Sequence, residues 1–169
     1  MSFFKKINSQ KGFTLVELLL YMGIFAIILV VTLQMFGSVF EAHLESQANS
    51  DVGADGRFIL NRFIYDMNRA QNISTPSSAG SASDTLSILI DGSTFTYGVS
   101  NNNLILQDSG NNTSDQLNSE GTDVSQISFI RLAGGDGKDV IQLSFTLTSK
   151  VVRRTKKEVM DFQTTGGLR

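Results

Sequence analysis

An almost uninterrupted apolar run from residue 13 to residue 40 constrains this chain more than any other feature of its sequence. Glu17 is the only formally charged residue in the run. As a helix, the run would be about 42 Å long, which exceeds the ~30 Å hydrocarbon core of a bilayer. Three lysines precede it, Lys5, Lys6 and Lys11, and acidic residues follow it. Because positive charge is retained on the cytoplasmic side, we expect the N-terminus to stay inside and the rest to be exported.

Three interpretations of this segment compete. A secretory signal peptide fits poorly, since the run is longer than a signal-peptide core and no small-x-small cleavage site follows it. A plain signal anchor explains the lysines and the length. It leaves Glu17 unexplained, because a carboxylate within the apolar run costs up to about 2.5–3.5 kcal/mol on insertion scales. If the chain is instead cut after Gly12, Phe13 becomes the new N-terminus. Glu17, about one helical turn further along, can then neutralise this ammonium group or the one on a neighbouring chain.

The stretch from Lys11 to Leu19, KGFTLVELL, resembles the type III signal of type IV pilins and pseudopilins, with glycine, phenylalanine, threonine and glutamate in register. The resemblance implies that a prepilin peptidase/N-methyltransferase cuts between Gly12 and Phe13 and methylates the Phe13 amine. It also implies that Glu17 guides docking into a growing filament. The further partners that it implies are other pilin or pseudopilin subunits, an inner-membrane assembly platform and membrane lipid. The chain would then be a single-pass protein of the cytoplasmic membrane, with its N-terminus cytoplasmic, that later enters a pilus or pseudopilus.

The apolar run continues into an amphipathic segment. Apolar residues recur at near-helical spacing between residues 41 and 73, so we expect one long helix with its first half in lipid and its second half packed on a domain. Gly53 and Gly56 weaken the second half by roughly 1 kcal/mol each relative to alanine, which predicts a bend or a break there. The expected organisation is a leader peptide at 1–12, a transmembrane and assembly half of the helix at 13–40, and an exported domain at 41–169.

The remainder of the chain has the pattern of an antiparallel sheet. Residues 74–84 and 108–123 are polar and are expected to be loops. Strands are expected at 85–90, 94–99, 104–107, 124–132, 139–152 and 159–162, with a hairpin between the fourth and the fifth. Their alternating apolar residues imply a sheet with one covered face, and the amphipathic helix is its natural cover. The predicted fold class is α+β and pilin-like: a long N-terminal helix, with a membrane half and an amphipathic half, packed on an antiparallel β-sheet.

Two stretches resemble the J-type pseudopilins and the W-type minor pilins. The helical stretch from Arg57 to Ile73 has their pattern of arginine and leucine and an Asp-hydrophobic pair at Asp66, and residues 162–169, FQTTGGLR, resemble their C-terminal ending. The resemblance implies a minor subunit. We expect Asp66 to form an intrahelical ion pair with Arg62 or Arg69. The apolar run contains no proline, which leaves the choice between pilus and pseudopilus open.

The composition removes most catalytic chemistries. The chain has no cysteine and one histidine, so thiol nucleophiles, disulfides and thiolate zinc sites are excluded, and a catalytic triad or a histidine-rich metal site has little material. The sequence also lacks a glycine-rich phosphate loop and a nucleophile elbow. The one histidine, His43, is expected to be solvated. We therefore expect no catalytic residue and no cofactor, and we expect the chain to be a substrate of cleavage and methylation rather than an enzyme.

Two further clusters are weak candidates for binding. Asp136 and Asp139, in the sequence GGDGKD, could help to hold a calcium ion, since some pilin-like proteins bind one in a C-terminal loop. Their carboxylates are too sparse for a tight site, so a hairpin turn is the favoured interpretation and no metal is expected. A basic cluster could contact nucleic acid or anionic lipid, although a solvated edge strand is favoured. Its members are Arg153, Arg154, Lys156 and Lys157.

These observations favour a structural function. The leading hypothesis is a minor pilin or pseudopilin that assembles through its helix into a type IV pilus or a type II secretion pseudopilus. The alternative is a tip or binding subunit of a competence or adhesion pilus that contacts DNA, a surface or a secreted substrate. A membrane-anchored enzyme is the third class, and no motif favours it.

Overall fold

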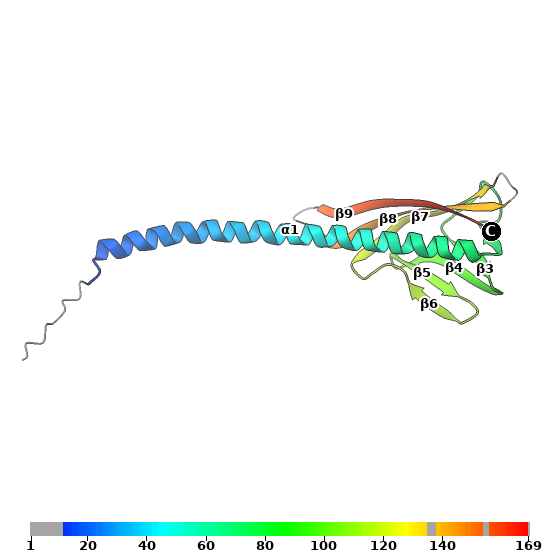
Figure 1. The fold of residues 1–169 in the computed structure, drawn as a ribbon, viewed down its shortest axis with the longest axis horizontal. Helices are drawn as coiled ribbons and strands as arrows, with labels where there is room; N and C mark the ends of the chain where they lie inside the picture. Colours follow the sequence, from blue (N-terminus) through cyan, green and yellow to red (C-terminus); the bar gives the residue numbers. More distant parts are fainter. Residues whose placement is uncertain (1–11, 135–137, 154–155, 169) are drawn as a thin grey trace, which may run out of the picture. The chain divides into compact units, whose positions relative to one another are not determined.

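The computed structural model describes residues 12–134, 138–153 and 156–168. Contacts separate the chain into two compact units, one that ends at Ala42 and one that begins at His43. Helix α1, Leu15–Arg69, is assigned as one helix that contributes to both units (Figure 1). We call the part up to Ala42 the N-terminal unit and the part from His43 the globular unit.

In the N-terminal unit, α1 exposes apolar side chains around its circumference. The helix is long enough and apolar enough to cross a membrane, and its most apolar window has no residue buried within the protein. The hydroxyls of Thr32 and Ser38 donate to the backbone carbonyls four residues earlier, at 2.8 and 3.1 Å, so neither presents an unpaired donor at the surface. A helix that is apolar on all sides is stable when lipid or other helices surround it.

The globular unit combines the second half of α1 with nine strands among its described residues, arranged in two antiparallel sheets. The five-stranded sheet, in spatial order, consists of β1 (Asn72–Thr75), β3 (Leu86–Ile90), β4 (Ser93–Ser100), β5 (Asn103–Asp108) and β6 (Thr113–Gln116). The four-stranded sheet consists of β2 (Ala82–Ser83), β7 (Thr122–Ala133), β8 (Asp139–Arg153) and β9 (Lys156–Gly167). This arrangement confirms the predicted α+β, pilin-like fold, in which a long N-terminal helix packs on antiparallel strands.

The centre of the core lies where α1 meets both sheets. Phe63 of α1 is fully buried, and its ring centroid lies 6.4 Å from that of Tyr97 on β4 and 6.5 Å from that of Phe129 on β7. The rings of Tyr97 and Phe129 are 6.2 Å apart, so the three form one aromatic cluster. Such pairs contribute about 0.5–1.5 kcal/mol each beyond the area that they bury. The helix therefore joins two sheets, and not the single sheet predicted from the sequence.

Residues 74–84, predicted to be a loop, contain strand structure. Ile73, just before this region, is buried, and β1 pairs with β3 while β2 pairs with β7. Arg131 of β7 holds the connecting segment, since its Nη1 donates to the carbonyls of Ile73, Pro76 and Ser77 at 3.1, 2.9 and 3.2 Å. The prediction was wrong because a serine-rich composition marks local turn preference, whereas strand partners come from distant parts of the chain.

Residues 108–123, also predicted to be a surface loop, contain β6 and four buried residues, which are Asp108, Leu117, Asn118 and Thr122. The Asn118 side chain accepts a hydrogen bond from the backbone N–H of Leu104 at 2.8 Å and donates to the carbonyl of Thr122 at 2.9 Å. The segment is thus tied to both sheets. Its polar residues serve as internal hydrogen-bonding groups, which composition alone does not reveal.

Helix α1 has no break at Gly53 or Gly56, contrary to the break that the sequence suggested. Gly56 is buried, and a Cβ added there would come within 2.2–2.7 Å of the Phe162 ring on β9. The missing side chain therefore lets β9 approach the helix. Strand β9 is also longer than predicted, because it pairs with β8 along most of its 12 residues. Here tertiary packing overrides the low helix propensity of glycine.

Candidate processing and assembly site

The candidate site begins with the start of α1. Leu15 is the first helical residue, and the carbonyl of Thr14 accepts the first helical hydrogen bond from Leu18 N at 3.1 Å. The Thr14 hydroxyl accepts a second one, from the backbone N–H of Glu17 at 3.3 Å. Thr14 is therefore the N-cap, and Thr-Leu-Val-Glu has the spacing of a capping box. Thr14 and Glu17, which define the start of the helix, both belong to the KGFTLVELL motif.

Glu17 occupies the first turn of α1, where the helix dipole favours a negative charge. One of its oxygens accepts a hydrogen bond from the hydroxyl of Tyr21 at 3.3 Å. From the sequence, the Phe13 amine was the only partner considered for Glu17, and this neutral partner was missed. The signal was available, since residues four apart lie on one face of a helix.

Phe13 lies beside the same two side chains. Its ring centroid is 6.0 Å from that of Tyr21, with an edge-to-face angle of 70°. The Phe13 side chain is 74% exposed. Phe13, Glu17 and Tyr21 thus form one surface cluster at the start of the helix, which we call the N-terminal cluster.

The predicted scissile bond, Gly12–Phe13, lies outside α1. Both residues are exposed and belong to no helix or strand. Nothing lies within 4 Å of a Cβ added to Gly12, so packing within the chain does not require glycine at this position. Exposed, non-helical backbone is the form in which proteases cut chains. The geometry is therefore compatible with cleavage, while the roles of Gly12, Phe13 and Glu17 stay predictions.

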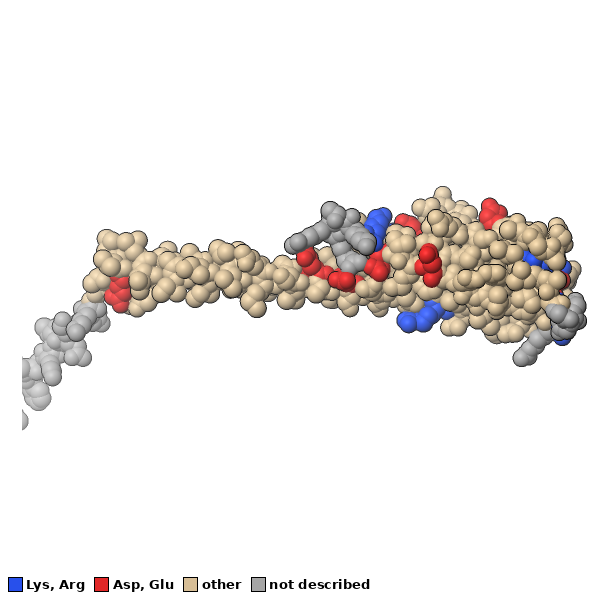
Figure 2. Space-filling view, turned by 90° about the horizontal axis from the view of Figure 1, so that it is seen from above, with Lys and Arg blue, Asp and Glu red and all other residues tan. Residues whose placement is uncertain are grey.

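The surface around the N-terminal cluster is uncharged. Figure 2 shows tan side chains along the first half of α1 and a red, acidic side chain near its start. Glu17 is the only acidic residue between residues 12 and 40. A lone carboxylate on such a surface is costly in lipid unless it finds a partner. The site can thus offer one negative charge to a cation and apolar surface to lipid or to other helices.

The other predicted sites have different outcomes. Asp139 forms an ion pair with Arg131, and this pairing lowers the pKa of Asp139 because the guanidinium stabilises the carboxylate. Asp136 lies outside the described residues, and within those residues no group of three or more His, Asp or Glu side chains could hold a metal ion. His43 is exposed. In the basic cluster, Arg154 also lies outside the described residues.

Asp66 is more deeply buried than its sequence pattern predicts. The predicted intrahelical pair with Arg62 is present, with Nε 2.9 Å from Oδ2, but the carboxylate is fully buried. The Tyr97 hydroxyl donates to the same oxygen at 2.5 Å. Burial, together with the Asp66 charge, raises the pKa of Tyr97. Arg69 instead pairs with Asp91, so the alternative pairing with Asp66 is not formed.

Comparison with known proteins identifies one family feature. Residues 7–33 match the prokaryotic N-terminal methylation motif. No curated protein and no solved structure matches the chain. The methylation motif and the pilin-like fold together define a type IV pilin-like protein with an apolar N-terminal helix. The motif implies processing by prepilin peptidase and assembly with pilin subunits from a membrane-anchored state.

Proposed function

We propose that this chain is a minor pilin or pseudopilin that assembles through its N-terminal helix into a type IV pilus or a type II secretion pseudopilus. The observation that carries the proposal is the lone carboxylate of Glu17, in the first turn of an exposed apolar helix. We assign the leader peptide to residues 1–12, the transmembrane and assembly half of the helix to 13–40, and the exported domain to 41–169.

Cleavage between Gly12 and Phe13 creates an amine within about one helical turn of Glu17. In a free subunit, water weakens the attraction between the two charges. Two unit charges 4 Å apart attract by about 1 kcal/mol in bulk water and by about 4 kcal/mol at an effective dielectric constant near 20. A filament excludes water between packed helices, so the pairing of Glu17 with the amine of a neighbouring subunit favours docking and sets the axial register.

Tyr21 has a supporting role in this mechanism. Its hydroxyl engages one oxygen of Glu17, and its ring contacts that of Phe13. A carboxylate has a second oxygen, which is available to an incoming amine. Tyr21 thus limits the rotamers of Glu17 before docking without consuming its charge.

The assignment as a minor subunit of the J-type or W-type rests on two stretches. The first is residues 57–73, in which Asp66 is buried between α1 and β4 and contacts Arg62 and Tyr97. The second is residues 162–169, whose first members belong to β9. Phe162 lies against Gly56 of α1, and Gly166 lies against Phe63 and Met67 of α1, so the described part of the second stretch contacts the helix that carries most of the first.

Processing is tested by N-terminal sequencing and intact mass of the protein from its native cell. Cleavage after Gly12 removes three lysines, so the basic residues fall from 14 to 11 against 16 acidic ones and the formal charge changes from −2 to −5. We expect the mature chain to begin with N-methylated Phe13. A chain that keeps Met1 in cells with active prepilin peptidase contradicts the processing step.

Assembly is tested with Glu17→Gln and Glu17→Val, measured as filament recovery after shearing and as cross-linking to neighbouring subunits. Both variants should be cleaved and inserted normally, and both should be impaired in incorporation because they lack the charge. Tyr21→Phe is the matched control, since it keeps the ring contact and the charge and should have a milder effect. Normal incorporation of both Glu17 variants would make the helix an ordinary anchor.

A further inference from the structure

The five-stranded sheet carries a hollow on the face opposite to the core. The hollow has a volume of about 500 Å³ and is lined by residues of β4, β5 and β6, by the turn between β4 and β5, and by Thr85, which precedes β3. On these strands Tyr97, Leu104 and Leu106 are buried in the core. Alternate residues of a strand point to opposite faces, so the neighbours of these three residues form the outer surface. We call this hollow the β4–β6 groove.

The strand register places the groove residues in rows. Thr96 of β4 lies opposite Gln107 of β5, which lies opposite Ser114 of β6. The next row contains Gly98, Ile105 and Gln116 in the same order. A Cβ added to Gly98 would meet only Thr85 Cγ2 at 3.5 Å, an ordinary contact. Packing therefore does not require this glycine, and its missing side chain deepens the groove.

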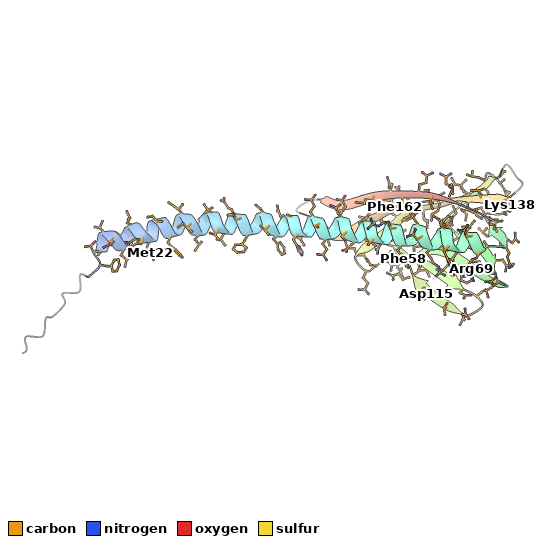
Figure 3. The ribbon with its side chains drawn as sticks, in the orientation of Figure 1. Met22, Phe58, Arg69, Asp115, Lys138 and Phe162 are labelled. Carbon is orange, nitrogen blue, oxygen red and sulfur yellow. The ribbon has the colours of Figure 1, made fainter. Side chains whose placement is uncertain are left out.

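The lining of the groove is mostly polar. None of its eleven described residues carries a formal charge. Within the described part of the chain, the side chains of Gln107 and Ser114 have no hydrogen-bond partner, whereas Gln116 donates to the carbonyl of Asn118 at 2.8 Å. Asp115 of β6, labelled in Figure 3, belongs to the opposite face of the strand. The groove thus presents uncommitted amide and hydroxyl groups without ions.

The groove also has apolar surface. Ile105 lies in the second of these rows, between Gly98 and Gln116. Small-ligand pockets measure about 300–1,000 Å³ and combine apolar contact with a few placed polar groups. Neighbouring strands are about 4.8 Å apart, so the polar side chains of one row recur at intervals similar to the length of a hexose unit.

We propose that the β4–β6 groove binds a neutral oligosaccharide. Amide and hydroxyl side chains both donate and accept hydrogen bonds, as the hydroxyl groups of a sugar require, and the C–H face of a sugar ring can lie against Ile105. Asp84 and Asp108 line the hollows on either side of the groove. Their carboxylates disfavour anionic ligands such as nucleic acid. This binding is independent of filament assembly through Glu17.

The test uses the full chain in a zwitterionic detergent, because sugar-based detergents would compete. The probes are cellotetraose, maltotetraose and tetra-N-acetylchitotetraose, measured by saturation-transfer NMR and by titration. Gly98→Val fills the groove and should abolish binding, and Gln107→Ala should weaken it about fivefold, as expected for one neutral hydrogen bond. Gln142→Ala, on β8 of the other sheet, is the matched control and should bind normally. Backbone NMR spectra of each variant establish that it folds.

The expected result is that at least one of the three probes binds, with an affinity that Gly98→Val and Gln107→Ala lower and that added salt does not change. Each probe is added at a concentration about ten times a millimolar dissociation constant. If none of the three probes then shows saturation transfer, the proposal is overturned. Binding that persists in Gly98→Val would also overturn the proposal. So would displacement of the bound sugar by a peptide that pairs with the edge strand β6.

Discussion

Alanine at Gly56 is expected to destabilise the globular unit, whereas alanine at Gly53, three residues earlier in the same helix, is expected to stabilise it. Both replacements gain up to about 1 kcal/mol of helix propensity. A Cβ at Gly53 would meet only the end of the Arg57 side chain, at 3.9 Å. A Cβ at Gly56 would come within 2.2, 2.3 and 2.7 Å of three atoms of the Phe162 ring.

The cost at Gly56 follows from what Phe162 itself contacts. Its ring stacks on that of Phe145, with centroids 5.3 Å apart and an angle of 17°. Overpacking costs about 1–3 kcal/mol, and a disturbed aromatic pair costs about 0.5–1.5 kcal/mol. Against the gain in helix propensity, the net destabilisation by Gly56→Ala should be about 1–3 kcal/mol.

Urea unfolding of a fragment comprising residues 43–169 measures both effects. With a slope of about 2 kcal/mol/M, the midpoint should rise by about 0.5 M in Gly53→Ala and fall by about 0.5–1.5 M in Gly56→Ala. Phe162→Leu should cost less stability in the Gly56→Ala background than alone, because the two sites are in contact. If Gly56→Ala stabilises the fragment as much as Gly53→Ala does, the close approach of β9 to α1 is refuted.

Three other outcomes are expected. The fragment 43–169 should show mixed helix and strand by circular dichroism and should unfold cooperatively; a disordered fragment at neutral pH would contradict the fold. The difference in phenolate absorbance between this fragment and its Tyr97→Phe variant should stay near zero up to about pH 11, because burial raises the pKa of Tyr97 above the usual value near 10; a phenolate signal near pH 10 would show that Tyr97 is solvated. Because Arg131 lowers the folded-state pKa of Asp139, the pair stabilises the fold above the unfolded-state pKa of about 3.9, and this contribution disappears as pH falls through the folded-state value. Asp139→Asn should therefore reduce the loss of stability in acid, measured by thermal unfolding from pH 7 downward, and an unchanged acid dependence would exclude the pair as its source.

The sequence by itself determined the properties that depend on short stretches of chain. The apolar run and the register of Lys11, Gly12, Phe13 and Glu17 predicted the helix, its exposure and the motif that residues 7–33 match. The start of α1 is local too, since Thr14 caps the helix through the Glu17 backbone three residues away. Alternating apolar residues gave the hairpin of β7 and β8, because a period of two is a local signal.

Only the tertiary structure decided which distant residues meet. The strands in residues 74–84 and 108–123 form because β3, β5 and β7 supply their partners, and their serine- and asparagine-rich composition gave no sign of this. The burial of Asp66 depends on Tyr97, 31 positions away. Gly56 weakens a helix in isolation, yet it is the residue that admits the Phe162 ring. Propensity measures the preference of one isolated segment, whereas the folded state also includes its contacts with every other segment. The free energy of the whole packed state therefore decides which secondary structure each segment adopts.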